Sequence, residues 1–225
     1  MPVGARPLLA AVLVLIALVL VAGCLADREA GVAVTGPPTA EAALSDGVML
    51  IKSTACGENT RCGTAFTAEI DGRLVLLTNR HVVEAGCSTT AQPWSGGADL
   101  PVREVWLARD ADVAVLLLDE GDLPPPLPVD VGVQLTPGQP IRVVGFPEAE
   151  PTVLAGHVQR IEQQQLVLAI DAGQGASGSP VIDADGRVVG QLYARARDDE
   201  ECCIATPIAQ AVAAAEDAEP AVVCP

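Results

Sequence analysis

The chain has 225 residues, half of them hydrophobic, and it carries 29 acidic against 13 basic side chains, for a formal net charge of −16. Such an acidic surface repels phosphate backbones, so we expect no nucleic-acid partner. Half-apolar composition suits a membrane protein whereas this charge suits a well-solvated one, so the location of the apolar residues decides between the two classes.

The first predicted element is an unbroken apolar run over residues 8–22, which follows Arg6. The run is too short to span a bilayer comfortably, and its charged start, apolar middle and small-residue exit are those of a secretory signal. The exit, residues 21–24 with the sequence Val-Ala-Gly-Cys, resembles the bacterial lipobox, in which the cysteine is lipidated and the preceding signal, here residues 1–23, is removed. Ordinary signal cleavage and an uncleaved anchor are the alternatives, and all three place the rest of the chain outside the cytoplasm.

The segment after the signal predicts a flexible tether. Residues 24–46 contain Gly36-Pro37-Pro38 and several alanines but no sustained apolar period, which is typical of a linker. We therefore expect a lipid on Cys24 to hold the exported chain at the extracytoplasmic face of a bacterial membrane. The acidic domain itself would not be drawn to anionic lipid head groups.

The cysteines indicate disulfide bonds. Setting Cys24 aside leaves an even number of cysteines, which favours disulfides in an exported protein. No C-x-x-C pair favours zinc, and the acidic run at residues 198–201 predicts a solvated loop, so we expect no metal site. The disulfide candidates are Cys56, Cys62, Cys87, Cys202, Cys203 and Cys224.

From residue 47 onward, short apolar runs alternate with turn residues at the spacing of an all-β barrel or sandwich. A proline-rich connector at residues 119–130 divides this region into near-equal halves, which favours two small barrels. Pro207–Glu216 is rich in alanine and predicts a short helix. The predicted strands are Val48–Lys52, Thr64–Glu69, Leu74–Thr78, Val102–Leu107, Val113–Leu118, Ile141–Phe146, Val153–Ile161, Gln165–Ile170, Pro180–Asp183 and Val188–Ala194.

Of the two histidines, His81 is the candidate base. It stands where the strand predicted at 74–78 runs into a turn, so its ring can lie at the edge of a cleft. His157 lies inside a strand-like run, which predicts a structural role. A histidine that accepts a proton needs a carboxylate on its other ring nitrogen to fix the tautomer and stabilise the imidazolium.

Asp112 is the candidate carboxylate, and Asp110 is its competitor. Asp112 directly precedes the apolar run 113–118, where an unpaired carboxylate would be costly. Asp110 is farther from that run and more easily solvated, which favours Asp112.

Ser177 is the candidate nucleophile, within Gly-Ala-Ser-Gly-Ser-Pro at residues 175–180. The flanking glycines let the amides of Gly175 and Ser177 turn toward one point and stabilise a developing oxyanion. Alone, this string is weak evidence, because an ordinary Gly/Ser turn has the same composition. The order His81, Asp112, Ser177, with the connector before the serine, indicates that each half supplies part of a cleft.

Three segments resemble the catalytic motifs of chymotrypsin-fold serine proteases, especially the compact bacterial trypsin-like peptidases of the HtrA and glutamyl-endopeptidase type. They are Thr-Asn-Arg-His-Val at 78–82, Asp-Val-Ala-Val-Leu at 112–116 and the serine segment at 175–180. Supporting similarities lie at residues 62–66, 144–147, 189–193 and 204–208. The resemblance covers about residues 47–216 and implies two six-stranded antiparallel β-barrels, at about 47–118 and 131–206, with a helix at 207–216 before a tail at 217–225.

The resemblance implies an endopeptidase that needs no cofactor and acts on a protein or peptide substrate. Ser177 would attack the substrate carbonyl, His81 would accept and return its proton, and Asp112 would orient His81. The amides of Gly175 and Ser177 would form the oxyanion hole. We expect the domain to be monomeric and, since the matched region ends near residue 216, to carry no appended PDZ module.

The resemblance also suggests where a substrate would bind. Gln191, Leu192 and Tyr193 would pair with the substrate backbone. Asp171, six residues before Ser177, is spaced like the acidic base of a trypsin-like pocket, but it also fits the aspartate that closes the preceding strand in bacterial relatives.

The family's bridge around its histidine suggests a disulfide between Cys62 and Cys87, and a pairing that uses Cys56 is the alternative. The sequence departs from the family at Ser179, where a second glycine is usual, and at Ala176, where Asn or Asp is common. Neither departure removes a catalytic group. A catalytically silent binding or sensing module is the alternative function, and an esterase is remote because the Gly-x-Ser-x-Gly elbow is missing.

Overall fold

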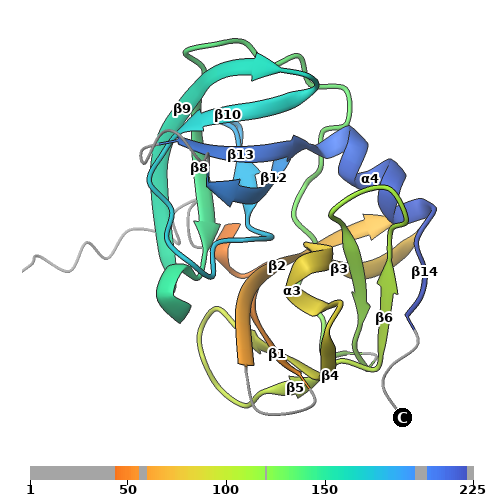
Figure 1. Ribbon diagram of the computed structural model, residues 1–225. Coiled ribbons are helices and arrows are strands. Elements are labelled where there is room, and N and C mark those ends of the chain that lie inside the picture. The colour runs from red at the N-terminus through yellow and green to blue at the C-terminus, as the bar shows by residue number, and fades with distance from the viewer. Residues whose placement is uncertain (1–43, 56–59, 120, 196–201, 222–225) are drawn as a thin grey trace, which may run out of the picture. The chain divides into compact units, whose positions relative to one another are not determined.

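The computed structural model describes residues 44–55, 60–119, 121–195 and 202–221, which lie in one unit of the chain, Pro38–Pro225. The predicted signal, Cys24 and nearly all of the tether fall outside these residues. In Figure 1 the first β half occupies the lower part of the view and the second half the upper part, with helix α4 (Ile208–Glu216) at their side. Within the described residues, no helix has the length and apolar character needed to cross a membrane.

The first half is an antiparallel sheet of eight strands in the order β14-β6-β7-β3-β2-β1-β4-β5. The β2–β3 hairpin turns at Asp71-Gly72, where both residues have a positive φ, as a tight hairpin requires. The strands are β1 (Val48–Ala55), β2 (Thr60–Ile70), β3 (Arg73–Thr78), β4 (Gly86–Pro93), β5 (Leu100–Pro101), β6 (Glu104–Leu107), β7 (Ala114–Leu117) and β14 (Glu219–Pro220).

The second half is a closed barrel of six strands in the order β10-β13-β12-β11-β8-β9. A short 3-10 helix, η1 (Pro147–Ala149), connects β8 to β9. The strands are β8 (Pro140–Gly145), β9 (Thr152–Glu162), β10 (Gln165–Ala169), β11 (Pro180–Ile182), β12 (Val188–Arg195) and β13 (Cys202–Pro207).

The all-β chymotrypsin-like fold class is confirmed, and each predicted strand overlaps a strand of the structure. The closed barrel of six strands predicted for the first half is wrong. The first half is a sheet of eight strands, to whose edge β14 adds by pairing with β6 after the end of α4. The pattern of apolar runs missed β4, β5, β13 and β14. In β4 the sequence is Gly-Cys-Ser-Thr-Thr-Ala-Gln-Pro, and only Thr89 and Ala91 are buried, so hydrophobic periodicity carries little signal there.

One hydrophobic cluster joins the two halves. Phe66 from β2, Phe146 from the end of β8 and Ile208 from α4 are all buried in it. The ring of Phe146 meets Trp94 edge to face, with centroids 5.2 Å apart. Since this cluster spans both halves, the loops of each half are held against the other by buried apolar surface.

The disulfide expected between Cys62 and Cys87 is not formed. Cys62, in β2, has a free thiol, whereas Cys87, in β4, is bonded to a cysteine whose side chain lies outside the described part of the structure. The physical reason is the strand order β2-β1-β4, which puts a whole strand between the two cysteines. Two strand spacings, about 10 Å, exceed the Cα separation that a disulfide can bridge.

The remaining cysteine candidates are tested only in part. The buried thiol of Cys203 donates a hydrogen bond to the carbonyl oxygen of Ile170 at 3.3 Å. The side chains of Cys56, Cys202 and Cys224 lie outside the described residues.

Candidate active site

His81 is held beside Asp112 by two hydrogen bonds. It lies in the short helix α3 (Arg80–Val83), directly after β3, and Asp112 lies in the loop before β7. The ring Nδ1 of His81 lies 2.7 Å from Asp112 Oδ2, and the backbone N–H of His81 donates to Asp112 Oδ1 at 2.9 Å. Because an ionised carboxylate only accepts, a neutral His81 carries its proton on Nδ1 and keeps the lone pair of Nε2 free for a proton.

Two neighbours of His81 hold the loop that carries Asp112. The fully buried Asn79 donates from Nδ2 to the carbonyl oxygen of Asp112 at 2.9 Å. Arg80 donates from Nη1 to the carbonyl oxygens of Ala108 at 2.9 Å and Arg109 at 3.2 Å. The segment that contains the histidine therefore fixes the position of the carboxylate.

Asp110 and His157 lie apart from this pair. Asp110 is exposed and lines a different surface pocket, near Asp217 and Glu219. His157 lies in β9, is exposed, and lines neither of the cavities that border Ser177. The structure thus brings Asp112, and not Asp110, to the histidine.

Ser177 lies in a tight loop between β10 and β11. Gly175 and Gly178 flank it with φ values of +91° and +90°, a left-handed conformation that glycine adopts without steric cost. A Cβ on Gly175 would overlap the carbonyl oxygen of Phe146, and one on Gly178 would overlap the carbonyl oxygen of Thr64. Both glycines are therefore required by conformation and by close approach to neighbouring backbone.

Two carbonyl groups of the serine loop are held by hydrogen bonds. The carbonyl oxygen of Gln174 accepts from the amide of Glu148 at 2.6 Å, and that of Ala176 accepts from the amide of Ser179 at 3.0 Å. Each of these carbonyl groups shares a peptide unit with the amide of the following residue. The direction of each C=O bond therefore sets the direction of the N–H bond in the same unit.

Those two amides are the predicted oxyanion donors, Gly175 and Ser177. In a trans peptide the C=O and N–H bonds point in opposite directions, so both N–H groups point away from the donors that hold the carbonyls. Within the described residues, neither amide donates to a protein group. Both are available to a ligand oxygen, which is what an oxyanion hole requires.

Ser177 borders two surface cavities. One, of about 470 Å³, is lined by both His81 and Ser177, so it lies where the two halves meet. The other, of about 440 Å³, has apolar walls that include Ala176, Leu192 and Cys203. A substrate chain crossing Ser177 would place side chains in both.

Asp171 does not serve as the base of the apolar cavity. It is exposed and does not line that cavity, whereas the next residue, Ala172, does. Asp171 lies between the end of β10 and the serine loop. Its role in substrate preference stays a prediction.

The predicted substrate-pairing residues take three different positions. Leu192 lines the apolar cavity, whereas Gln191 is fully buried and lines neither cavity. The pairing of β12 with β13 shifts register between Leu192 and Ala194, so Tyr193 is the bulged residue. Its carbonyl oxygen lies 3.5 Å from Ser177 Oγ.

Two residues at the site were missed by the sequence analysis. Thr64, from β2, reaches the serine loop across the boundary between the halves, and Glu148 lines both cavities. Thr64 lies within the Cys-Gly-Thr-Ala-Phe segment, which offered a signal. No sequence signal marked Glu148. Its position depends on a left-handed backbone conformation, φ 53° and ψ 27°, in a loop with no recognisable sequence pattern.

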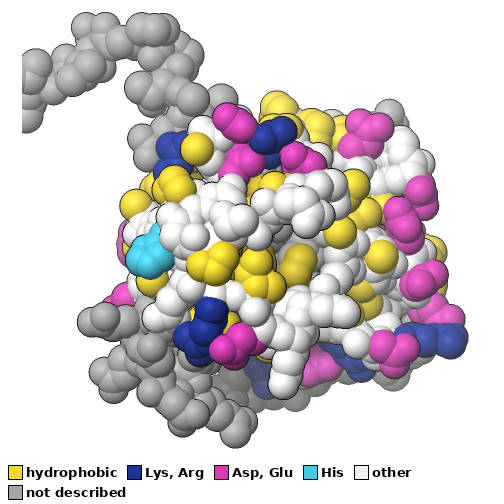
Figure 2. All heavy atoms as spheres, turned by 90° about the horizontal axis from the view of Figure 1, so that it is seen from above, with side chains coloured by type: hydrophobic (Ala, Val, Ile, Leu, Met, Phe, Trp, Pro, Cys, Tyr) yellow, Lys and Arg dark blue, Asp and Glu magenta, His cyan; other side chains and the backbone are white. Residues whose placement is uncertain are grey.

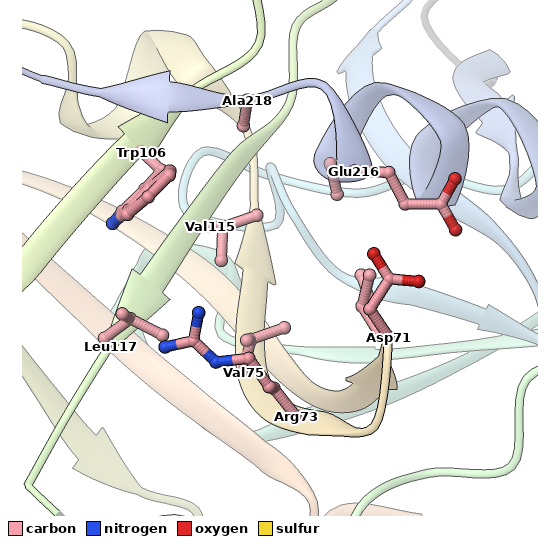
Figure 3. Close-up of a pocket in the computed structure, with 10 residues that line it drawn as sticks. Asp71, Arg73, Val75, Trp106, Val115, Leu117, Glu216 and Ala218 are labelled. Carbon is pink, nitrogen blue, oxygen red and sulfur yellow. The ribbon is translucent and has the colours of Figure 1, made fainter.

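A further pocket lies away from this site. Figure 3 shows Trp106, Val115 and Leu117 on the strands beside the end of α4, with Asp71 and Glu216 at the rim. This pocket measures about 130 Å³ and is lined by none of the candidate catalytic residues. It is formed where the end of α4 packs against the first half.

Acidic side chains are spread over the face of the molecule that is seen from above. Figure 2, turned by 90° from the view of Figure 1, shows them around this face, with basic side chains in smaller groups. This agrees with the net charge of −16.

Comparison with known proteins identifies the family. The sequence profile of the trypsin-like peptidase domain matches residues 63–190. The chain belongs to this family. The matched region contains His81, Asp112 and Ser177.

Named relatives support the assignment. The chain is 28% identical over 155 residues to "Serine protease Rv3671c" of Mycobacterium tuberculosis, and the match covers 62% of this chain and 37% of that protein. The chain thus spans well under half the length of this relative. The crystal structure of the Rv3671c protease in its active form has a TM-score of 0.67 and 26% identity, covering 79% of this chain and 84% of that one.

A more distant structure shows the fold alone. The HtrA-type protease AlgW with a tripeptide has a TM-score of 0.65 and 22% identity, covering 77% of this chain and 60% of that one. The resemblance to the HtrA type seen in the sequence is therefore matched in the tertiary structure.

Proposed function

We propose that this peptidase domain is a serine endopeptidase in which His81, Asp112 and Ser177 are the catalytic residues. The observation that carries the proposal is the hydrogen bond between His81 and Asp112, together with the cavity that His81 and Ser177 both line. The pair leaves Nε2 of His81 free to accept a proton. Membership of the trypsin-like peptidase family supports the proposal of a serine peptidase.

The reaction follows from these positions. Ser177 Oγ attacks the carbonyl carbon of the scissile peptide as its proton passes to Nε2 of His81, and Asp112 stabilises the resulting imidazolium. The amides of Gly175 and Ser177 donate to the oxygen of the tetrahedral intermediate. His81 then returns the proton to the leaving amine, which leaves an acyl group on Ser177, and water releases it by the same steps.

We propose that the apolar cavity takes the side chain that precedes the scissile bond. Ala172, Ala176 and Leu192 offer it apolar walls, which favour a small or medium apolar side chain. Glu148 is the one charged residue among the described residues that line it, so an acidic side chain would be repelled. We also propose that the carbonyl oxygen of Tyr193, which lies 3.5 Å from Ser177 Oγ, accepts a hydrogen bond from the substrate backbone amide beside Ser177.

We also propose that the domain works outside the cytoplasm, on a protein or peptide substrate, tethered through a lipid on Cys24. The apolar run at residues 8–22 and the Val-Ala-Gly-Cys exit support this placement. Metabolic labelling of the full chain with a fatty-acid analogue should mark the wild type. Labelling that persists in Cys24→Ala would contradict the lipid site.

Active-site labelling of the purified protein tests the catalytic proposal. A fluorophosphonate probe should label the wild type and not Ser177→Ala, and the same variant should lose cleavage of casein. Ser88→Ala, an exposed serine in β4, serves as the control and should keep both activities. Absence of labelling and cleavage in the correctly folded wild type would instead favour a silent binding module.

Peptide-library cleavage tests the pocket. The residue before each cut should be small or medium and apolar, and Glu148→Gln should increase the tolerance for acidic residues there. A strong preference for glutamate in the wild type would contradict the proposed cavity.

A further inference from the structure

Thr64 of β2 contacts the serine loop through both its backbone and its side chain. Its backbone N–H donates to the carbonyl oxygen of Ser177 at 2.8 Å. Its hydroxyl Oγ1 donates to the carbonyl oxygen of Gly175 at 2.9 Å and accepts from the amide of Phe146 at 3.0 Å. A residue of the first half is thus bonded to both residues whose amides face the cleft.

The position of Thr64 is itself tightly fixed. Thr64 is fully buried, and its carbonyl oxygen accepts from Thr78 Oγ1 at 2.7 Å. Gly145 and Gly178 pack directly on it, since a Cβ on Gly145 would lie 2.9 Å from Thr64 Oγ1 and one on Gly178 would overlap its carbonyl oxygen. The hydroxyl therefore has one orientation, in which it donates its proton to the carbonyl oxygen of Gly175 and accepts a hydrogen bond from the amide of Phe146.

Thr64 completes a set of four held carbonyl groups. Those of Gln174 and Ala176 are held by the amides of Glu148 and Ser179, as described above. Those of Gly175 and Ser177 are held by the hydroxyl and the amide of Thr64. Four consecutive carbonyls, at residues 174–177, are therefore fixed, so rotation of any peptide unit in this stretch would break a hydrogen bond.

The hydroxyl of Thr64 also supports the second holding element. The hydroxyl accepts a hydrogen bond from the amide of Phe146, which directly precedes η1. In η1, the amide of Glu148 donates to the carbonyl oxygen of Gln174. Glu148 and Ala149 both have a positive φ, 53° and 64°, which is unfavourable for residues with a Cβ. A conformation of this kind persists only where surrounding contacts over-determine it, and the bond to Thr64 is one of those contacts.

We propose that Thr64 is a positioning residue for the oxyanion hole. Its hydroxyl ties the carbonyl of Gly175 to the amide of Phe146, and thereby keeps the N–H groups of Gly175 and Ser177 directed at the substrate oxygen. The inference rests on the proposed serine-peptidase function. Thr64 does not touch the substrate, and its effect is transmitted through the backbone of the serine loop.

Substitution of Thr64 by valine tests this role, because valine keeps the shape and removes only the hydroxyl. Loss of a whole oxyanion donor lowers kcat by about 100- to 1000-fold. Because Thr64 positions the donors and does not itself donate to the oxyanion, we expect Thr64→Val to lower kcat less, by about 10- to 100-fold. KM should change less than about threefold, because the substrate is not contacted. Thr64→Ser, which keeps the hydroxyl, should retain kcat within about threefold.

Thr67 provides a matched control on the same strand. It is also a fully buried threonine of β2, but its Oγ1 has no hydrogen-bond partner within the described residues. Thr67→Val should therefore keep both kcat and KM. Affinity for a peptide boronic acid, which forms a tetrahedral adduct on Ser177, should fall in Thr64→Val and not in Thr67→Val, while affinity for a product peptide stays unchanged in both.

The inference would be overturned if Thr64→Val and Thr67→Val had equal kcat, or if Thr64→Val lost equal affinity for the boronic acid and for the product peptide. It would also be overturned if Thr64→Ser, which keeps the hydroxyl, were as impaired as Thr64→Ala, which lacks it. The comparison of Thr64→Ser with Thr64→Ala tests the inference even if Thr64→Val does not fold. Failure of the wild type to react with a fluorophosphonate would instead contradict the proposed function.

Discussion

The two halves hold their parts of the active site in different ways. In the first half, side chains do the holding: Asn79 and His81 bond to Asp112, and Arg80 bonds to the loop that leads to it. In the second half, the loop around Ser177 is held mainly by backbone hydrogen bonds, by the hydroxyl of Thr64 from the first half, and by glycines that have no room for a side chain. Substitutions around Asp112 should therefore lower kcat more than they lower stability, whereas substitutions of the glycines beside Ser177 should lower stability as well as activity.

The largest expected effect in the first half is at Asp112. Asp112→Asn should lower kcat by about 10⁴-fold, because an amide stabilises the wrong histidine tautomer and cannot compensate the imidazolium. Asp110→Asn, at the exposed neighbouring carboxylate, should stay within about twofold. Steady-state kinetics on one peptide substrate measure both, and comparable losses in the two variants would contradict the assignment.

Gly178→Ala is the corresponding test for the second half. The Cβ would overlap the carbonyl oxygen of Thr64, so we expect a loss of about 2–4 kcal/mol in unfolding free energy together with loss of fluorophosphonate labelling. Gly138→Ala is the control, because Gly138 has φ +85° but no atom within 4 Å of an added Cβ. Left-handed strain alone should cost it only about 1 kcal/mol, and equal losses in urea unfolding would show that the contact with Thr64 is irrelevant.

A smaller effect is expected for Asn79→Ala. The change removes the donor to the carbonyl of Asp112 and leaves that half-buried oxygen without its partner, which should cost about 1–3 kcal/mol of unfolding free energy. Because the loop carrying Asp112 would loosen, kcat should fall by about 10-fold. Unchanged kcat in a destabilised variant would show that Asn79 supports the fold and not the chemistry.

The smallest effect is expected on the exposed surface of the first half. Arg103 donates hydrogen bonds to Asp119 at 2.8 and 2.5 Å and lowers the pKa of that carboxyl below its ordinary value. A lowered pKa in the folded state contributes stability above the unfolded-state pKa, and this is lost as pH falls through the folded-state value. Asp119→Asn should therefore lower the Tm slightly at neutral pH, and a Tm difference that persists in acid would contradict this origin.

The sequence predicted the chemistry of the site better than its supports. His81, Asp112 and Ser177 each stand beside an apolar run or a glycine, so local pattern marks them. Thr64 is a hydroxyl inside a strand, and its importance depends on which loop of the other half meets it. Hydrogen bonds between residues over 80 positions apart, such as that of Phe146 to Thr64, leave no periodic trace in the sequence.

The disulfide and the pocket show the same limit. Cys62 and Cys87 are similarly placed around His81 in sequence, but β1 lies between their strands. Asp171 has the spacing of a pocket base, but it is exposed, and the next residue, Ala172, is the one that lines the apolar cavity. Spacing along the chain fixes neither strand order nor side-chain direction in an irregular loop.

The amino-acid sequence by itself determined the all-β class, the ten apolar strands and the order of the three catalytic candidates, because alternating burial and turn residues are local properties of the chain. Tertiary structure decided the polar strand β4, the short strand β13, the free thiol of Cys62, the left-handed conformation of Glu148 and the proposed role of Thr64. The physical reason is that these features depend on backbone hydrogen bonds and close contacts between distant segments, whose partners are fixed only when both halves have folded together.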